Sequence, residues 1–178
     1  MNDKNRQNLG KDCAYIAVFV ALTIAAQLCL SFIPGVEVVT VLFVTFSFAF
    51  GCRRGVVAAT VFSLLRQLVF GFYPTVLVLY LIYYNFLALL FGYLGWWSKI
   101  TPQKLILLTA LACVCTVCFT IMDNIITPLW YGYSKRALKI YFYASFSFMI
   151  PQVICTAVSV GVLFLPLVKI FNVLKNRH

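Results

Sequence analysis

Six long stretches of this chain are too apolar to fold in water, and each is about long enough to cross a lipid bilayer. Of the 178 residues, 63% are hydrophobic and 10% are charged, which is not the composition of a soluble protein. About 20 apolar residues span the ~30 Å hydrocarbon layer as a helix. Because a backbone in lipid must satisfy its own hydrogen bonds, these stretches are expected to be helices. The sequence therefore predicts an all-α integral membrane bundle of six transmembrane helices.

The predicted helices occupy nearly the whole chain. They run over about 13–32, 38–50, 56–70, 75–97, 105–126 and 141–171. Little sequence remains for a separate soluble unit, so residues 1–178 are interpreted as one domain. The last helix contains Pro151 and is long enough to tilt, bend or extend beyond the bilayer. The polar, aromatic and basic segment 130–139 is expected to be the longest connection.

Basic residues predict the orientation of the bundle. Six spans place both termini on the same side, together with the connections after the second and fourth helices. That side carries Lys4, Arg6, Lys11, Arg53, Arg54, Lys99, Lys104, Lys169, Lys175 and Arg177. Cytoplasmic segments of membrane proteins are enriched in Lys and Arg, so both termini are expected to be cytoplasmic. The net charge of +10 is thus explained by membrane orientation better than by nucleic-acid binding.

One basic segment is an exception to this pattern. Lys135, Arg136 and Lys139 fall on the predicted outer side. They either anchor the connection among lipid headgroups or contact an anionic solute, and the headgroup interpretation is favoured.

The seven cysteines lie mostly inside apolar segments. Cys115 and Cys118 form a CxxC pair with Cys113 nearby. Buried thiols commonly pack as small hydrophobes, and packing is favoured over metal or redox chemistry because polar company is lacking. Neither a metal site nor a cofactor is expected. The sequence contains neither a phosphate-binding GxxxxGK[ST] loop nor the residues for a Ser-His-Asp set, so an enzyme is not predicted.

Polar residues inside the predicted spans are the candidate binding residues. An ionisable side chain in hydrocarbon costs roughly 2.5–3.5 kcal/mol on insertion scales, so it is a functional hypothesis by default. Most of these residues are predicted in the outer half of the bilayer. The candidate substrate-binding residues are Glu37, Arg66, Asn85, Asp123, Asn124, Trp130 and Gln152.

Several of these candidates have a structural alternative. Arg66 can form an internal ion pair with Glu37 or Asp123, can hold a carboxylate or phosphate of the substrate, or can do both in turn. Asn85 can join two helices through a hydrogen bond. Trp130 can belong to an interfacial aromatic belt. Only Arg66 favours an anionic solute.

The first predicted helix carries small residues at every fourth position. Ala17, Ala21 and Ala25 form a stripe that lets another helix approach closely. Spacing alone leaves two alternatives open, which are packing within the bundle and docking to a partner membrane protein.

The order of these features resembles the substrate-binding S components of energy-coupling factor (ECF) transporters, which are small prokaryotic uptake proteins. The length, the six spans and the inside termini are similar. The resembling segments are the alanine stripe, Pro34–Glu37, Phe50–Gly51 with Gly55, Phe72–Thr75, Phe91–Gly95, and Pro151 through Phe164–Leu167.

This resemblance implies a function and partners. An S component of this family captures a vitamin or related micronutrient from outside the cell. It associates in the cell membrane with a membrane coupling subunit and two cytoplasmic ATPases, which drive uptake. The family's docking surface corresponds here to Ala17, Ala21 and Ala25. The resemblance does not identify the vitamin.

Two other functions compete with this expectation. A standalone secondary transporter or channel would favour inverted repeats and an ion site in mid-membrane, and no convincing internal repeat is found. A membrane-embedded enzyme acting on lipids would favour acids and histidines clustered on cytoplasmic ends, whereas the acids here are scattered and mostly outward.

Overall fold

A computed structural model describes residues 3–33, 38–95 and 100–176. These residues form six helices and no strand, which confirms the predicted all-helical architecture. The helices are α1 (Asp3–Leu30), α2 (Val39–Phe50), α3 (Cys52–Phe70), α4 (Pro74–Leu94), α5 (Pro102–Tyr131) and α6 (Lys135–Asn176).

Local sequence signals explain several helix ends. Proline lies in the first turn of α4 and of α5, where its missing N–H costs no hydrogen bond. The Thr101 hydroxyl accepts a hydrogen bond from the Lys104 N–H and caps α5. Gly51 and Gly132 adopt positive φ angles of 85° and 59°. Because glycine reaches this region without strain, these two residues end α2 and α5.

Four of the helices are long and apolar enough to cross a membrane. These segments are Gly10–Leu30, Pro74–Leu94, Pro102–Tyr131 and Lys135–Lys175. They indicate a membrane protein. The α2 helix has only 12 residues, or roughly 18 Å of length. The α3 helix contains three arginines among its 19 residues.

The α2 helix is the centre of the molecule. Every residue of α2 except Leu42 is buried, and α2 packs against each of the other five helices. Aromatic rings fill this core. Phe43 lies 5.1 Å from Phe62 and 4.8 Å from Tyr84, measured between ring centroids. Phe46 stacks on Phe19 at 4.0 Å.

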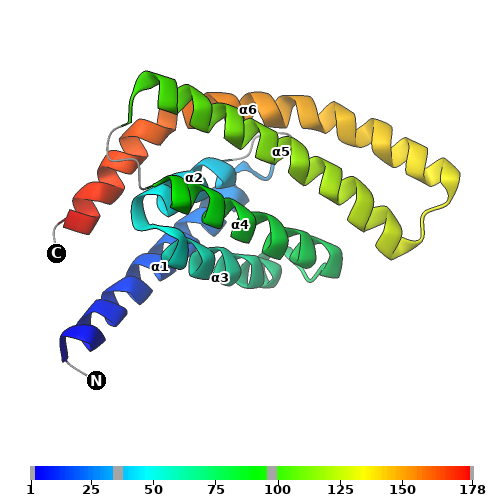
Figure 1. Cartoon of the computed structure of the whole chain (residues 1–178). Coiled ribbons are helices and arrows are strands. Elements are labelled where there is room, and N and C mark those ends of the chain that lie inside the picture. Colours follow the sequence, from blue (N-terminus) through cyan, green and yellow to red (C-terminus); the bar gives the residue numbers. More distant parts are fainter. Residues whose placement is uncertain (1–2, 34–37, 96–99, 177–178) are drawn as a thin grey trace.

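Four of the other helices form two long pairs beside this core, and α1 packs mainly against α3. In Figure 1, α3 and α4 run side by side, and so do α5 and α6. The turns that join the partners of each pair lie at one end of the molecule, and both termini lie at the other. Near the termini, the Tyr15 hydroxyl donates to the Leu174 carbonyl at 3.3 Å, and Lys175 Nζ donates to the Ala49 carbonyl at 2.9 Å.

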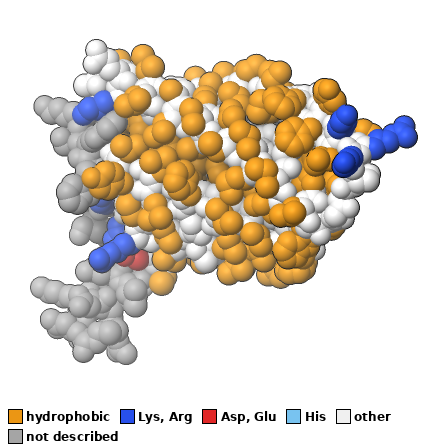
Figure 2. Space-filling view, turned by 45° about the vertical axis from the view of Figure 1, so that its right-hand side comes forward, with side chains coloured by type: hydrophobic (Ala, Val, Ile, Leu, Met, Phe, Trp, Pro, Cys, Tyr) orange, Lys and Arg blue, Asp and Glu red, His pale blue; other side chains and the backbone are white. Residues whose placement is uncertain are grey.

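The surface matches a membrane setting. Figure 2 shows hydrophobic side chains over the middle of one face and Lys and Arg side chains near both ends. At the end that holds the termini, Arg54 forms an ion pair with Asp12 at 2.9 Å. This distribution places charge at the two ends and leaves the flank apolar.

Several predicted boundaries were wrong, and the largest differences lie at the start of α1 and around the α5–α6 connection. The α1 helix begins ten residues earlier than expected, because extending an established helix into a polar tail costs little. The segment 130–139 is not a long connection, since α5 continues to Tyr131 and α6 begins at Lys135. Helix α5 passes through Pro128 before Gly132 ends it. The Ser134 hydroxyl then accepts a hydrogen bond from the Ala137 N–H and caps α6.

Candidate functional site

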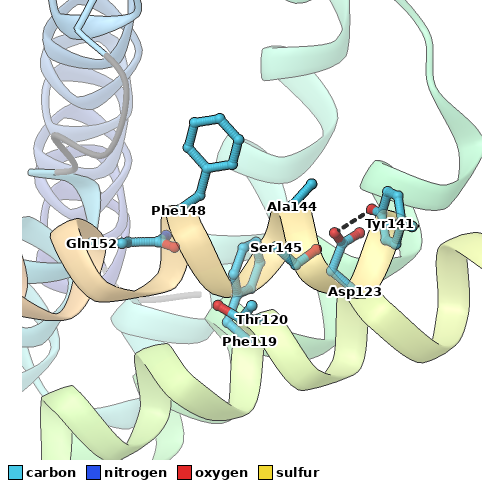
Figure 3. Close-up of a pocket in the computed structure, with 8 residues that line it drawn as sticks. All are labelled: Phe119, Thr120, Asp123, Tyr141, Ala144, Ser145, Phe148 and Gln152. Atoms are coloured by element: carbon cyan, nitrogen blue, oxygen red, sulfur yellow. Dashed lines mark hydrogen bonds between the residues drawn. The ribbon is translucent and has the colours of Figure 1, made fainter. Parts of the chain in front are cut away.

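A pocket of about 270 Å³ lies between α5 and α6, in the half of these helices nearer their connecting turn. Figure 3 shows its lining side chains, which come from both helices. They are Phe119, Thr120, Asp123, Tyr141, Ala144, Ser145, Phe148 and Gln152. Two of the predicted site residues, Asp123 and Gln152, therefore meet in one pocket.

In the part of the chain that the structure describes, the carboxylate of Asp123 is the one charged group that lines this pocket. The Tyr141 hydroxyl donates to Oδ2 at 2.6 Å, and the Thr127 hydroxyl donates to Oδ1 at 2.7 Å. Both donors are neutral. Among the described residues, the ion pair is Arg54 with Asp12, so Asp123 has none there. At the centre of a membrane helix, an aspartate costs roughly 2.5–3.5 kcal/mol on insertion scales.

Aromatic side chains join the pocket to the rest of the bundle. The Phe119 ring, which forms one wall, lies 4.7 Å from the ring of Tyr83 and 5.8 Å from that of Tyr80. Across the pocket, the Tyr141 ring lies 5.6 Å from that of Tyr133. Phe119 is thus packed against α4, and Tyr141 is packed against the α5–α6 connection.

Next to the pocket, α5 and α6 are joined by a buried polar contact. The hydroxyls of Thr116 and Thr156 lie 3.1 Å apart, and both side chains are buried. Asn124 is also buried, and its Oδ1 has no hydrogen-bond partner among the described residues. Asn124 lies beside Asp123 in the sequence but does not line the pocket.

Arg66 is not in the pocket. Its Nε donates to Gln27 Oε1 at 3.1 Å. Its Cζ lies 4.4 Å from the Tyr80 ring centroid and 4.7 Å from that of Phe70. The predicted ion pair with Asp123 is therefore absent from the described part of the chain. The other predicted partner, Glu37, lies outside the described residues.

Asn85 and Trp130 also lie away from the pocket. The Thr60 hydroxyl donates to Asn85 Oδ1 at 3.2 Å, and Asn85 Nδ2 donates to the Leu81 carbonyl at 2.8 Å. Asn85 thus joins α3 to α4, as its structural alternative anticipated. Trp130 is 60% exposed in the last turn of α5, a position that suits an interfacial aromatic residue.

Sequence reasoning missed most of the pocket lining. Tyr141, Ser145, Phe148 and Gln152 recur at spacings of four, three and four residues. This spacing places them on one face of a helix. Thr116, Thr120 and Thr127 provide a similar pattern on α5. These repeats could have indicated the pocket lining from the sequence. The prediction included only Asp123 and Gln152, because it relied on charged and amide side chains.

The alanine stripe faces away from the bundle. Ala17, Ala21 and Ala25 are all exposed, whereas Phe19 and Thr23 on the same helix are buried. The stripe is therefore not part of the packing within this chain. Among the described residues, no group of three or more His, Cys, Asp or Glu side chains can hold a metal ion. Of the CxxC pair, Cys115 is buried and Cys118 exposed.

The pocket and the stripe define a class only broadly, as a helical membrane-type protein with a polar pocket and an unoccupied face of small residues. No protein-family model, no curated protein and no solved structure matches this chain.

Proposed function

We propose that this chain is the substrate-binding S component of an ECF-type transporter. It captures a vitamin or related micronutrient from outside the cell. A membrane coupling subunit and two cytoplasmic ATPases then drive uptake. The carrying observation is the exposed stripe of Ala17, Ala21 and Ala25 on α1. Small side chains on an outward face let a foreign helix approach closely.

The pocket supports the capture step. It combines aromatic walls with a few polar groups, including Asp123, Ser145 and Gln152, and such a lining is typical of small-molecule sites. The pocket and the α5–α6 connection lie toward one end of the molecule, and both termini lie toward the other. A solute can thus be held at one membrane face while partners act from the opposite face.

The proposed orientation is multi-pass in the prokaryotic cell membrane, with both termini cytoplasmic. Basic side chains on the terminal end support it, because cytoplasmic segments are enriched in Lys and Arg. The described ones are Lys11, Arg53, Arg54, Lys104, Lys169 and Lys175. On the outer side, the exposed Lys135, Arg136 and Lys139 suit contact with lipid headgroups.

The test is purification of the tagged full chain from native membranes. We expect a coupling subunit and two ATPases to co-purify. Proteoliposomes holding the complex should take up the micronutrient found with it only when ATP is supplied. Accumulation against a gradient by the chain alone would instead identify a secondary transporter. Chemical conversion of a lipid by the chain would identify an enzyme.

A further inference from the structure

We propose that the pocket between α5 and α6 binds a small organic cation, an amine or a protonated nitrogen heterocycle, through the carboxylate of Asp123. This inference rests on the proposed function, because it assigns the chemical class of the captured solute. It departs from the anionic solute that Arg66 alone favours in the sequence.

The charge of the pocket lining favours a cation. Both carboxylate oxygens of Asp123 accept hydrogen bonds, one from Tyr141 and one from Thr127, which is the pattern of an ionised carboxylate. The donors are neutral hydroxyls, so they orient the group and leave its charge in place. A bound cation compensates this charge, whereas a bound anion adds a like charge at short range.

The carboxylate of Asp123 also has acceptor capacity left for a ligand. Two oxygens offer about four lone-pair sites, and the hydrogen bonds from Tyr141 and Thr127 occupy two of them. A ligand ammonium or ring N–H can use the others. Such a charge-assisted hydrogen bond is about twice as strong as a neutral one. Tyr141 on α6 and Thr127 on α5 orient the carboxylate before the ligand binds.

The rest of the pocket lining suits a cation as well. Phe119, Tyr141 and Phe148 supply three aromatic rings, and ring faces attract cations. Ser145 and Gln152 add polar atoms that can orient a ligand. Within the described part of the chain, no Lys or Arg lines this pocket.

The one arginine within the apolar part of α3 is engaged elsewhere. Arg66 contacts Gln27, Tyr80 and Phe70. Arg66 contacts the Tyr80 ring, and the Tyr80 ring in turn contacts Phe119, which lines the pocket. Two aromatic rings thus separate the guanidinium group from the pocket. An anion in the pocket would therefore lack a direct positive partner among the lining residues.

The size of the pocket restricts the ligand further. Its volume of about 270 Å³ falls just below the ~300–1,000 Å³ typical of small-molecule sites. A single ring with a short side chain suits this space. The bound group is thus a compact cation with an aromatic or apolar body.

The experiment compares three probes that share a phenyl ring and a short chain but differ in charge. They are phenethylamine, 2-phenylethanol and phenylacetate, each measured by equilibrium dialysis at neutral pH on the full chain in nanodiscs. Empty nanodiscs correct for partition into lipid. Because a hydrogen bond to a charged group contributes about tenfold or more in affinity, we expect phenethylamine to bind at least ~10-fold tighter than either other probe.

Four variants make the result specific. Asp123→Asn keeps the shape but removes the charge, and should abolish the preference for the amine. Asp123→Glu keeps the charge and should retain the preference. Tyr141→Phe removes one of the two hydrogen bonds that orient the carboxylate, and should reduce the preference without abolishing it, because the charge remains. Asp12→Asn removes the same charge at the opposite end of the molecule, where Asp12 pairs with Arg54, and should behave as the unsubstituted chain does.

Three results would overturn the inference. They are equal or tighter binding of phenylacetate or 2-phenylethanol, survival of the amine preference in Asp123→Asn, and absence of binding by all three probes. Co-purification of the ATPases is scored separately. Their presence with an anion-preferring pocket rejects only the cation assignment, and their absence with a cation-preferring pocket rejects only the proposed transporter.

Discussion

The guanidinium group of Arg66 lies over the ring of Tyr80, with 4.4 Å between Cζ and the ring centroid. Gln27 connects to both residues, accepting from Arg66 Nε at 3.1 Å and donating to the Tyr80 hydroxyl at 3.3 Å. The three residues come from α3, α4 and α1. An arginine inside an apolar bundle is thus stabilised here by an amide and a ring, with no carboxylate in contact among the described residues.

We expect Arg66→Lys to lower the free energy of unfolding by about 1 kcal/mol, because lysine loses the planar stacking on Tyr80 and the fixed Nε–H donor. Thermal unfolding of the purified chain in detergent measures this change. Arg53→Lys is the matched control, since Arg53 is exposed at the start of α3. Equal melting temperatures for the two variants would show that the stacking contributes nothing.

Gly92 permits a close approach between α4 and the start of α3. A Cβ atom at position 92 would lie 2.6 Å from the Cys52 backbone nitrogen and 2.7 Å from its Cα. Backbone atoms cannot rotate away, so Gly92→Ala should destabilise the fold by about 1–3 kcal/mol, the usual cost of overpacking.

Gly161→Ala provides the matched control for that substitution. Nothing lies within 4 Å of a Cβ built at Gly161, which is exposed on α6. Alanine is the better helix former by up to ~1 kcal/mol, so this variant should be neutral or more stable. Chemical or thermal unfolding of both variants measures the difference, and a tolerated Gly92→Ala would refute the close packing.

The hydrogen bond between Thr60 and Asn85 should be measurable as a coupling energy. Single variants Thr60→Val and Asn85→Ala and the double variant form a cycle, with unfolding free energy as the readout. Hydrogen bonds between membrane helices average about 0.6 kcal/mol and reach ~1.7 kcal/mol, so a coupling in that range is expected. A value of zero would mean that Asn85 does not join α3 to α4.

Docking through α1 predicts a specific loss of partners. Ala21→Leu places a bulky side chain on the exposed stripe and should reduce recovery of the ATPases on the order of tenfold, equivalent to ~1.4 kcal/mol. Val158→Leu is the control, because Val158 is exposed on α6. Quantitative mass spectrometry of the purified chain gives the ratio, and an equal reduction in both variants would contradict docking at this stripe.

The sequence predicted the helices better than their ends or contacts. Long apolar runs identify α4, α5 and α6 because burial in lipid requires length and apolarity together. The region around Pro128 was misplaced as a helix end. Proline usually ends a helix in water, but neighbouring helices in a membrane can satisfy the backbone groups that it frees.

The candidate site was predicted only in part, for a related reason. Depth along a helix can be predicted from the sequence, and it puts Asp123 and Gln152 near the same level; both line the pocket. Which side chains a residue at that depth can contact depends on which helices become neighbours, and the sequence does not show this. Arg66 has a similar predicted depth but lies on α3, where Gln27 and Tyr80 are within reach. Tyr141 is not among the predicted site residues, because an uncharged phenol in a membrane helix indicates no function until its acidic partner is known.

The short central helix also has a consequence for biogenesis. With 12 residues, α2 falls well below the ~17–25 that a helix needs to span the hydrocarbon layer. We therefore expect α2 to enter the membrane together with α4 and α6, which pack against it. A chain that ends before α6 should expose the aromatic side chains of α2 and be degraded faster than the full chain.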